Sequence, residues 1–359
     1  MHQHEIRVAL VGYGLGGRSF HAPVIAATPG MRLAAIVTGN ADRQRLASAE
    51  RPNARVVDTP DELFQDLSSV DLVVISTPNR THVPLALQAV DAGCAVVVDK
   101  PLAPSAAEAR RLVDAAKRRN VFLSVYQNRR WDGDFLTVRR LLSKGALGKV
   151  HRFESRLERW RPTLKGGWRE QSDAGEGGGL LFDLGSHLID QALSLFGPAT
   201  DVYAELDRRR PGAVVDDDVF VALTHAPGVR SHLWASVVAP QNGPRLRVLG
   251  DRAAYTKLGA DIQEDALRRG GRPDDAGWGI ESPEQYGLLG VGQDVRPVPT
   301  ERGDYRGFYS GVVRSLRDGA PPPVDASDAI AGLEVIETAL RFQIPDGPRA
   351  DRTELIEPS

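Results

Sequence analysis

Three side chains of this sequence have the types and spacing needed to move a proton and a hydride. Lys100 lies in the sequence DKP, just after the apolar residues 95–98, and Asp183 and His187 stand at i and i+4 in DLGSH. That spacing puts the carboxylate and the imidazole on one helix face, one turn apart. Histidine titrates near neutral pH and can take a hydroxyl proton, and a lysine ammonium stabilises negative charge developing on the oxygen. The set predicts alcohol oxidation or ketone reduction, with Asp183 holding the imidazole or binding a neighbouring hydroxyl, although a DxxxH pair alone is equally typical of a surface ion pair.

A metal site fits the same residues less well. Asp183 and His187 would supply two ligands, no third candidate has ligand spacing, and Cys94 is the only thiol. Catalytic zinc needs three protein ligands. The three aspartates at residues 216–218 are interpreted as a turn that opens a strand. We therefore expect no metal.

A glycine-rich turn after the apolar residues 6–11 predicts a dinucleotide site. Gly12, Gly14 and Gly17 match GxGxxG, with Leu15 inside the turn. The first glycine permits the tight turn, the second lets the backbone approach a pyrophosphate, and the third lets the following helix pack closely on the strand. A bare glycine motif is weak evidence, but a strand before it and a helix expected after it favour a nicotinamide dinucleotide over a structural turn.

The residues after the second strand favour NADP over NAD. NAD sites place an acidic residue there to bind the ribose 2′-hydroxyl, but here Thr38, Gly39 and Asn40 follow the strand and the first carboxylate is Asp42. Small polar groups followed by Arg43 can instead accept a 2′-phosphate, because guanidinium pairs well with phosphate oxygens. The alternative is that the arginine is a solvated helix residue.

Other residues are expected along the path of the cofactor. Thr77 and Pro78 follow the apolar strand DLVVIS, and Asn79 is expected both to line this path and to cap the next helix. His82 is interpreted as helix packing or surface. His21 could approach the nicotinamide end or have a structural role.

Composition indicates a soluble, two-domain protein. The chain has 359 residues, a formal net charge of −2 and 42% hydrophobic residues, without an apolar stretch long enough to span a bilayer. We expect no nucleic acid and no membrane as partner. The start runs directly into a strand without a secretory pattern, and a single cysteine suits a reducing cytosol, so a cytoplasmic location is expected.

The hydrophobic pattern changes near residue 128. Before it, continuous apolar runs alternate with helical patterns, as is typical of parallel strands covered on both faces. This predicts an α/β fold that begins with a doubly wound Rossmann domain over residues 1–128. Residues 129–359 are predicted to form an α+β domain with a large open, mostly antiparallel sheet, since four strands alternate apolar and polar residues. These elements are helices at 131–142, 180–196, 304–318 and 327–342, and strands at 150–159, 201–209, 219–224 and 230–238. The open sheet predicts a homodimer or homotetramer.

Together, the motifs resemble the Gfo/Idh/MocA oxidoreductases over nearly the whole chain. The resemblance lies in the Gly12 turn, in Asp99-Lys100-Pro101 where the family usually has Glu-Lys-Pro, and in the DxxxH pair. Further stretches look like the NADP-dependent scyllo-inositol dehydrogenase branch: SFHAP at 19–23, QNRRWD at 127–132, DLGSHLIDQ at 183–191, PQNGPR at 240–245 and QEDAL at 263–267. The resemblance implies that Lys100, Asp183 and His187 are the catalytic set. It also implies that Asp99, a shorter carboxylate than the usual Glu, lies at the cofactor.

A site for a polyhydroxylated ring should be polar, with a few flat surfaces. Asn128, Arg129 and Trp131 would enter the crevice between the domains, and Trp160 and Trp168 lie in the connection to Asp183. The alternatives are a solvated helix start for Arg129 and core packing for the tryptophans. The resemblance implies interconversion of scyllo-inositol and its ketone, an inosose. Another sugar or keto-sugar and a non-catalytic NADP-binding regulator stay open.

Overall fold

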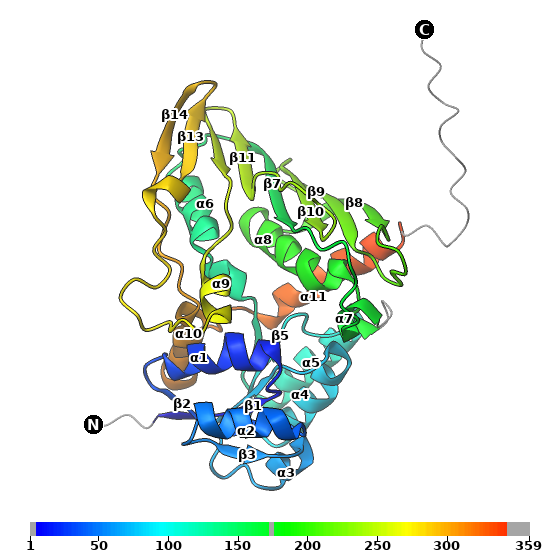
Figure 1. Cartoon of the computed structure of the whole chain (residues 1–359), viewed down its shortest axis with the longest axis vertical. Coiled ribbons are helices and arrows are strands. Elements are labelled where there is room, and N and C mark those ends of the chain that lie inside the picture. Colours follow the sequence, from blue (N-terminus) through cyan, green and yellow to red (C-terminus); the bar gives the residue numbers. More distant parts are fainter. Residues whose placement is uncertain (1–4, 172–175, 343–359) are drawn as a thin grey trace.

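The computed structural model describes residues 5–171 and 176–342, which build two sheets (Figure 1). The first sheet has six strands in the order β3-β2-β1-β4-β5-β6, all paired in parallel, which confirms the predicted Rossmann fold. These strands are β1 (Ile6–Val11), β2 (Met31–Val37), β3 (Arg55–Val57), β4 (Leu72–Ile75), β5 (Ala95–Asp99) and β6 (Leu123–Tyr126). The intervening helices are α1 (Ala22–Ala26), α2 (Ala41–Glu50), α3 (Pro60–Gln65), α4 (His82–Asp91) and α5 (Ala106–Arg119).

The strand order reverses between β1 and β4, and this reversal locates the crevice. In open α/β sheets, ligands bind outside the carboxyl ends of the strands at such a point. Here the Gly12 turn leaves β1, and Ser76 leaves β4 after its N–H donates to the Val11 carbonyl (2.8 Å). Lys100 follows the last residue of β5, the next strand over.

The second sheet has eight strands in the order β14-β13-β12-β11-β7-β10-β9-β8. Every neighbouring pair is antiparallel except β7 with β10, so the predicted mostly antiparallel sheet is confirmed. The strands are β7 (Val150–Glu158), β8 (Ala199–Asp207), β9 (Asp218–His225), β10 (Arg230–Ser236), β11 (Leu246–Gly250), β12 (Ala254–Lys257), β13 (Gly287–Val291) and β14 (Asp294–Val298). Strands β3 and β11–β14 were not predicted. β3 has only three residues, β11–β14 are short and lack the continuous apolar sequence of β4 and β5, and β14 is mostly exposed.

The helices of the second part join the two sheets. They are α6 (Gly133–Ser143), α7 (Trp168–Gln171), α8 (Ser186–Phe196), α9 (Gln263–Arg268), α10 (Arg306–Asp318) and α11 (Ala326–Leu340). Helix α11 packs on α8 and β8 of the second sheet and also on α5 and β6 of the first, and α10 contacts α1. One buried apolar cluster therefore runs through both sheets. The domain boundary at residue 128 stays a prediction.

Two predicted helices differ from the observed ones. Residues Asn128–Trp131 form a 3-10 turn (η3) and α6 begins at Gly133, because Asp132 is extended (ψ 134°) and its buried carboxylate accepts a hydrogen bond from the Tyr305 hydroxyl (2.8 Å). The predicted helix at 180–196 begins with a π-helical turn, η5 (Leu181–Gly185), and continues as α8. Turns of this kind occur frequently at functional sites.

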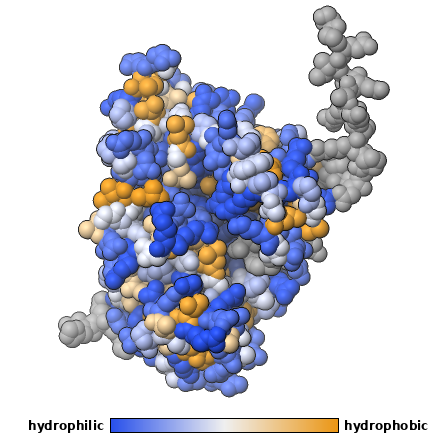
Figure 2. Space-filling model, in the orientation of Figure 1, coloured by the Kyte–Doolittle hydropathy of each residue, from blue (hydrophilic) through white to orange (hydrophobic). Residues whose placement is uncertain are grey.

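The face of the molecule seen in Figure 2 is mainly polar. Figure 2 shows a largely hydrophilic face with small, separate apolar patches. None of the helices within the described ranges is long and apolar enough to cross a membrane. Cys94 is buried and free.

The glycine turn is tight enough to exclude side chains at two of its positions. Gly12 has a φ of +102°, and a Cβ there would overlap the Ser76 carbonyl. A Cβ on Gly17, in the turn η1 (Gly16–His21), would overlap the carbonyl oxygen of Gly12. Both clashes are with main-chain atoms, so rotation of a side chain cannot relieve them.

We predict that Gly17→Ala lowers the free energy of unfolding by about 2 kcal/mol or more, because overpacking against a fixed backbone forces the turn apart. Gly332→Ala is the matched control. A Cβ at Gly332, inside α11, meets nothing within 4 Å, and alanine there should be neutral or stabilising by about 0.5–1 kcal/mol. Urea unfolding followed by circular dichroism measures both. Equal stability of the two variants would contradict the close packing described for the turn.

Candidate active site

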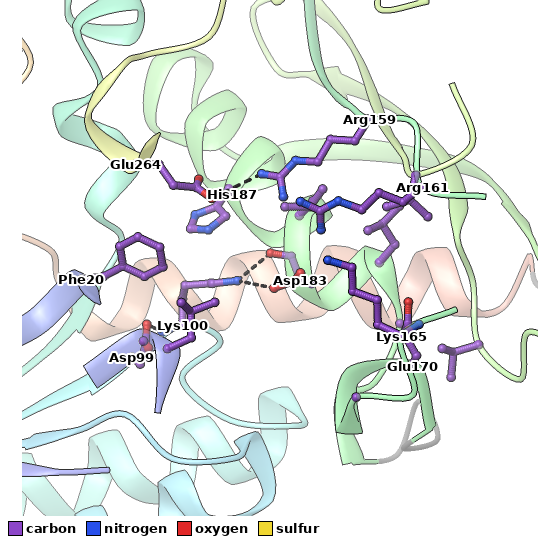
Figure 3. A pocket seen from close by; sticks show the side chains of 18 of the residues that line it. Phe20, Asp99, Lys100, Arg159, Arg161, Lys165, Glu170, Asp183, His187 and Glu264 are labelled. Carbon is purple, nitrogen blue, oxygen red and sulfur yellow. Dashed lines mark hydrogen bonds and ion pairs between the residues drawn. The ribbon is translucent and has the colours of Figure 1, made fainter. Parts of the chain in front are cut away.

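A cavity of about 360 Å³ lies where the carboxyl ends of the first sheet face the second domain (Figure 3). Lys100, Asp183 and His187 all line it, although 83 residues separate the first two in sequence. The structure therefore brings the three predicted chemical groups together. Leu15, Asp99, Asn128 and Arg129 line the same cavity.

The Lys100 ammonium group joins the two domains. Its Nζ donates to the main-chain carbonyl of Asp183 (2.6 Å) and to its carboxylate Oδ1 (3.2 Å). On its own domain, the Lys100 N–H donates to Asp99 Oδ1 (2.8 Å). The lysine side chain is 12% exposed, so the charge reaches the cavity but has little contact with solvent.

Hydrogen bonds at both ends hold the segment that carries Asp183 and His187. At its start, the Leu181 N–H donates to Asp216 Oδ2 (2.6 Å). Further along α8, Arg130 makes two bonds to Asp190 (2.8 and 2.7 Å). Gln191 donates to the main-chain carbonyl of Arg129 (3.0 Å). The last residues of DLGSHLIDQ are therefore anchors for the first.

His187 is buried, and its surroundings keep it neutral. Burial lowers its pKa well below the usual 6.5, and the nearby cations of Lys100, Arg129, Arg245 and Arg159 lower it further. Its Nδ1 is also buried and has no hydrogen-bond partner among the described residues. A neutral imidazole at neutral pH can accept a proton, as a general base must.

Asp99 is held as a carboxylate beside the lysine. Burial alone would raise its pKa, but the neighbouring His21, Lys100 and His82 outweigh burial and lower it. Its Oδ2 accepts a hydrogen bond from the Ser76 hydroxyl (3.0 Å). His21 lies beneath it, fully buried, with its ring 4.2 Å from that of Tyr126 and its Nδ1 2.6 Å from the Tyr309 hydroxyl. His21 thus packs under the site and is not among the cavity-lining residues.

The glycine turn leaves room for a dinucleotide. A Cβ placed on Gly14 meets only Arg43 Nη1, at 3.9 Å, and one on Gly12 would lie 3.1 Å from Thr77 Cγ2. Arg43 and Thr77 therefore flank one open turn. After β2, Thr38 is buried and Asn40 caps α2 by accepting from the Arg43 N–H (3.0 Å). The residues present fit a nicotinamide dinucleotide, with no carboxylate at residues 38–40.

Asn79 does not cap the following helix, so that prediction is wrong. The 3-10 turn η2 (Asn79–Thr81) begins after Pro78, and α4 begins after Thr81; neither start has a side-chain cap. Instead, the Asn79 amide donates to the Gly177 carbonyl (2.9 Å), in the segment before Asp183. His82 is buried between the same loops, with Nδ1 2.8 Å from the Pro101 oxygen and Nε2 2.9 Å from the Thr77 oxygen.

Two of the three predicted tryptophans, Trp131 and Trp160, are not among the cavity-lining residues. Trp131 packs edge-on against Phe308 (5.6 Å between ring centres), and Trp160 is 57% exposed and outside the lining. The side chain of Trp168 lies outside the described part of the structure. The neighbours of Trp160, Arg159 and Arg161, do line the cavity. Successive side chains of an extended chain point to opposite sides, so an error of one position exchanges tryptophan for arginine.

Charged residues that the sequence analysis did not select make up much of the wall. Glu264 receives ion pairs from Arg129, from Arg159 (3.4 Å) and from Arg268 (2.8 Å). Burial would raise its pKa, but these cations outweigh burial and lower it to about 2. Phe20, Tyr126, Arg161 and Lys165 also line the cavity. In the sequence, Glu264 could be noticed only as part of QEDAL at 263–267, one of the stretches that carry the family resemblance.

No group of three or more metal-ligating side chains occurs among the described residues. Asp216, the first of the three consecutive aspartates, accepts the hydrogen bond from the Leu181 N–H described above. Asp217 accepts an ion pair from Arg210 (2.9 Å).

Fold and site together define a dehydrogenase with a nicotinamide dinucleotide-binding Rossmann domain. Residues 6–127 match the profile described as "Oxidoreductase family, NAD-binding Rossmann fold", and residues 139–343 match the family's C-terminal alpha/beta domain. The chain belongs to the Gfo/Idh/MocA family of oxidoreductases. It is accordingly an NAD(P)-dependent oxidoreductase of the kind that acts on CH–OH groups.

Relatives from several bacteria match over nearly the whole chain. Oxidoreductase YdgJ of Escherichia coli K12 is 41% identical, with 94% of this chain and 96% of YdgJ covered. The scyllo-inositol 2-dehydrogenase (NADP(+)) IolW of Bacillus subtilis 168 is 36% identical, with 93% of each chain covered. Among solved structures, the oxidoreductase yvaA of Bacillus subtilis superposes with a TM-score of 0.89 at 35% identity, covering 94% of this chain and 96% of its own.

We predict that Glu264→Gln lowers the free energy of unfolding at pH 7 by about 3 kcal/mol, because it removes the carboxylate that Arg129, Arg159 and Arg268 share and leaves the buried Arg129 with Asp132 alone among the described residues. The pKa of Glu264 is lowered from 4.5 to about 2. The contribution of the Glu264 carboxylate to the free energy of unfolding is therefore complete above about pH 4.5 and is lost as the pH falls towards 2. The difference between variant and wild type should narrow below pH 4.5.

Urea unfolding at pH 7, 5, 4 and 3.5 measures this difference. Glu205→Gln is the matched control, since Glu205 is exposed and, among the described residues, its carboxylate accepts a hydrogen bond from the Tyr203 hydroxyl alone. A loss for Glu264→Gln no larger than for the control, or one independent of pH, would contradict the stabilising role of the cluster.

Proposed function

We propose that this protein is an NADP-dependent dehydrogenase that interconverts a cyclic polyol, scyllo-inositol, and its ketone by hydride transfer. The observation that carries the proposal is the Lys100–Asp183 contact in one cavity with a buried, neutral His187. The substrate is suggested by the Bacillus subtilis relative named as a scyllo-inositol 2-dehydrogenase.

In this mechanism the protein supplies proton transfer and electrostatic stabilisation. His187 accepts the hydroxyl proton during oxidation and returns it during reduction. Lys100 stabilises the negative charge that develops on the same oxygen, and solvent screens this interaction little because the lysine side chain is only 12% exposed. Asp183 holds the ammonium group through its carbonyl and carboxylate and can bind a neighbouring hydroxyl. A nicotinamide ring, when bound, supplies the hydride acceptor.

Asn128 and Arg129 are proposed as substrate-binding residues, because both line the cavity. For the dinucleotide we propose Gly12, Gly14, Leu15, Gly17, Thr38, Arg43, Thr77, Pro78, Asn79, Asp99 and Lys100. Preference for NADP is supported by Arg43 beside Gly14 and by the absence of a carboxylate at residues 38–40.

The first experiment mixes the purified protein with NADP or NAD and with scyllo-inositol, myo-inositol or glucose, and follows the absorbance of the reduced nicotinamide. We expect the fastest reduction with NADP and scyllo-inositol, and we expect Arg43→Ala to narrow the preference for NADP over NAD. Activity on glucose alone would favour a sugar or keto-sugar dehydrogenase. No reaction while NADP still binds would favour first another sugar, then a non-catalytic regulator.

We predict that Lys100→Ala and His187→Ala each lower kcat by about 10²–10⁴-fold, the range expected when a group acting in the transition state is removed. NADP affinity, measured by quenching of protein fluorescence, should stay near normal in His187→Ala. In Lys100→Ala it should fall far less than kcat, because Lys100 is one of many proposed dinucleotide contacts. Lys144→Ala and His151→Ala are matched controls at exposed positions. Loss of cofactor affinity in both active-site variants would argue against these roles.

We also propose a homodimer or homotetramer built across the outer face of the eight-stranded sheet. Phe220 and Trp234 pair across β9 and β10 with ring centres 5.0 Å apart. They lie on the face opposite the buried Val221 and Leu233. Helices α8 and α11 pack on this sheet.

Solution scattering at micromolar concentration tests the assembly. A mass two or four times that of the chain is expected, and Trp234→Glu should lower it. A monomeric mass for the wild-type protein would refute the assembly.

A further inference from the structure

One extended segment forms a whole side of the cavity. From Arg159 to Gly167, every second residue lines it: Arg159, Arg161, Thr163, Lys165 and Gly167. The intervening residues do not. Around the bridge at Trp160, extended backbone sends successive side chains to opposite sides, and the alternation continues past a bend at Thr163. The segment therefore presents a row of three cationic side chains and one hydroxyl to the substrate space.

Most cationic side chains of the cavity are neutralised by carboxylates. Lys100 pairs with Asp183, and Arg210 pairs with Glu170 (2.8 Å). Arg129, Arg159 and Arg268 share Glu264. Arg161 and Lys165 differ, because neither makes an ion pair with a carboxylate of the described residues.

The excess positive charge is local. Seven cationic and five carboxylate side chains line the cavity, whereas the whole chain has a formal net charge of −2. The crowding lowers the pKa of Arg159, through burial first and through the Arg129 and Arg161 charges as well, despite the opposing effect of Glu264. An anion at Arg161 and Lys165 would relieve this repulsion.

The two cations lie away from the cofactor turn. Figure 3 shows Arg161 and Lys165 pointing into the cavity on the far side of the Lys100–Asp183 contact from Phe20 and Asp99. The phosphates of a dinucleotide belong at the Gly12 turn and Arg43, so they do not account for these charges.

We propose that Arg161 and Lys165 form a subsite for an anionic substituent of the substrate, so that the enzyme prefers a polyol or sugar bearing a carboxylate or phosphate group. This rests on the proposed hydride transfer between NADP and a CH–OH group, and it names an anionic polyol or sugar as a better substrate than neutral scyllo-inositol. The reacting CH–OH group lies at Lys100 and His187, and the anionic group lies against the cationic row. Guanidinium and ammonium groups both bind carboxylate and phosphate oxygens well, so the test separates these two sources.

The kinetic test compares matched neutral and anionic compounds: glucose with glucuronate and glucose 6-phosphate, and myo-inositol with its 1-phosphate. With NADP, we expect kcat/KM to be at least about tenfold higher for an anionic member than for its neutral partner. Arg161→Gln and Lys165→Gln should each raise KM for that anion by about 10- to 100-fold, the loss expected for a charge-assisted hydrogen bond, with little change in kcat. The KM values for glucose and myo-inositol should not change.

Arg32→Gln and Lys144→Gln are matched controls, because both side chains are exposed and neither lines the cavity. They should leave the ratio of anionic to neutral kcat/KM unchanged. An equal decrease in the ratio for these controls would show general charge attraction and would overturn the subsite.

A binding experiment separates the subsite from the reaction. Glucuronate and glucose 6-phosphate are titrated calorimetrically into the NADPH-loaded protein, in which their alcohol groups cannot be oxidised. Anion binding that is lost in Arg161→Gln and Lys165→Gln supports the subsite even if no compound is turned over, which would refute only the proposed reaction. Turnover of neutral polyols, with no preference for anions and no effect of either variant on anion binding, would overturn the subsite and leave the proposed reaction standing.

Discussion

The contact between the Lys100 ammonium and Asp183 is the interaction on which the rest of the site depends. It joins the end of a strand in one domain to a π-helical turn in the other. Much of the surrounding structure fixes one of its two sides. Asp99 and His82 bond to the main chain next to the lysine. Asp216 and Arg130 hold the opposite segment through Leu181 and Asp190.

The second constraint is charge. Burying several arginines beside a histidine keeps the imidazole neutral, which suits a base, but cations held out of water are costly unless they are paired. Glu264 forms ion pairs with three arginines and so offsets part of this desolvation penalty. The cavity wall therefore contains cations that are paired with carboxylates and cations that have no such partner among the described residues. The paired charges support the fold, whereas Arg161 and Lys165, which have no carboxylate partner in the described part of the chain, line the cavity.

Fold and specificity are carried by different parts of the chain. The Rossmann sheet and the turn at Gly12 are built from local rules, namely continuous apolar strands and glycines where main chains touch. The polar wall comes from residues 159–167 and from α9, which meet Arg129 only in the folded chain. The wall that we propose to bind the substrate is therefore built from segments other than the Gly12 turn.

The sequence by itself determined the alternation of buried strands and helices in the first domain, without the three-residue β3, and singled out Lys100, Asp183 and His187 as candidates. Both follow from short-range patterns: apolar runs, glycine spacing and the i, i+4 repeat. It also indicated an open, mostly antiparallel second sheet. Only the tertiary structure decided that Asn79 bonds to Gly177, that Trp131 packs on Phe308, and that Arg161 faces the cavity while Trp160 faces away. The reason is physical. In the sequence Arg159-Trp160-Arg161, either the arginines or the tryptophan could line a polar pocket. The side that each one faces is set by the pairing of Trp160 with the distant Val238.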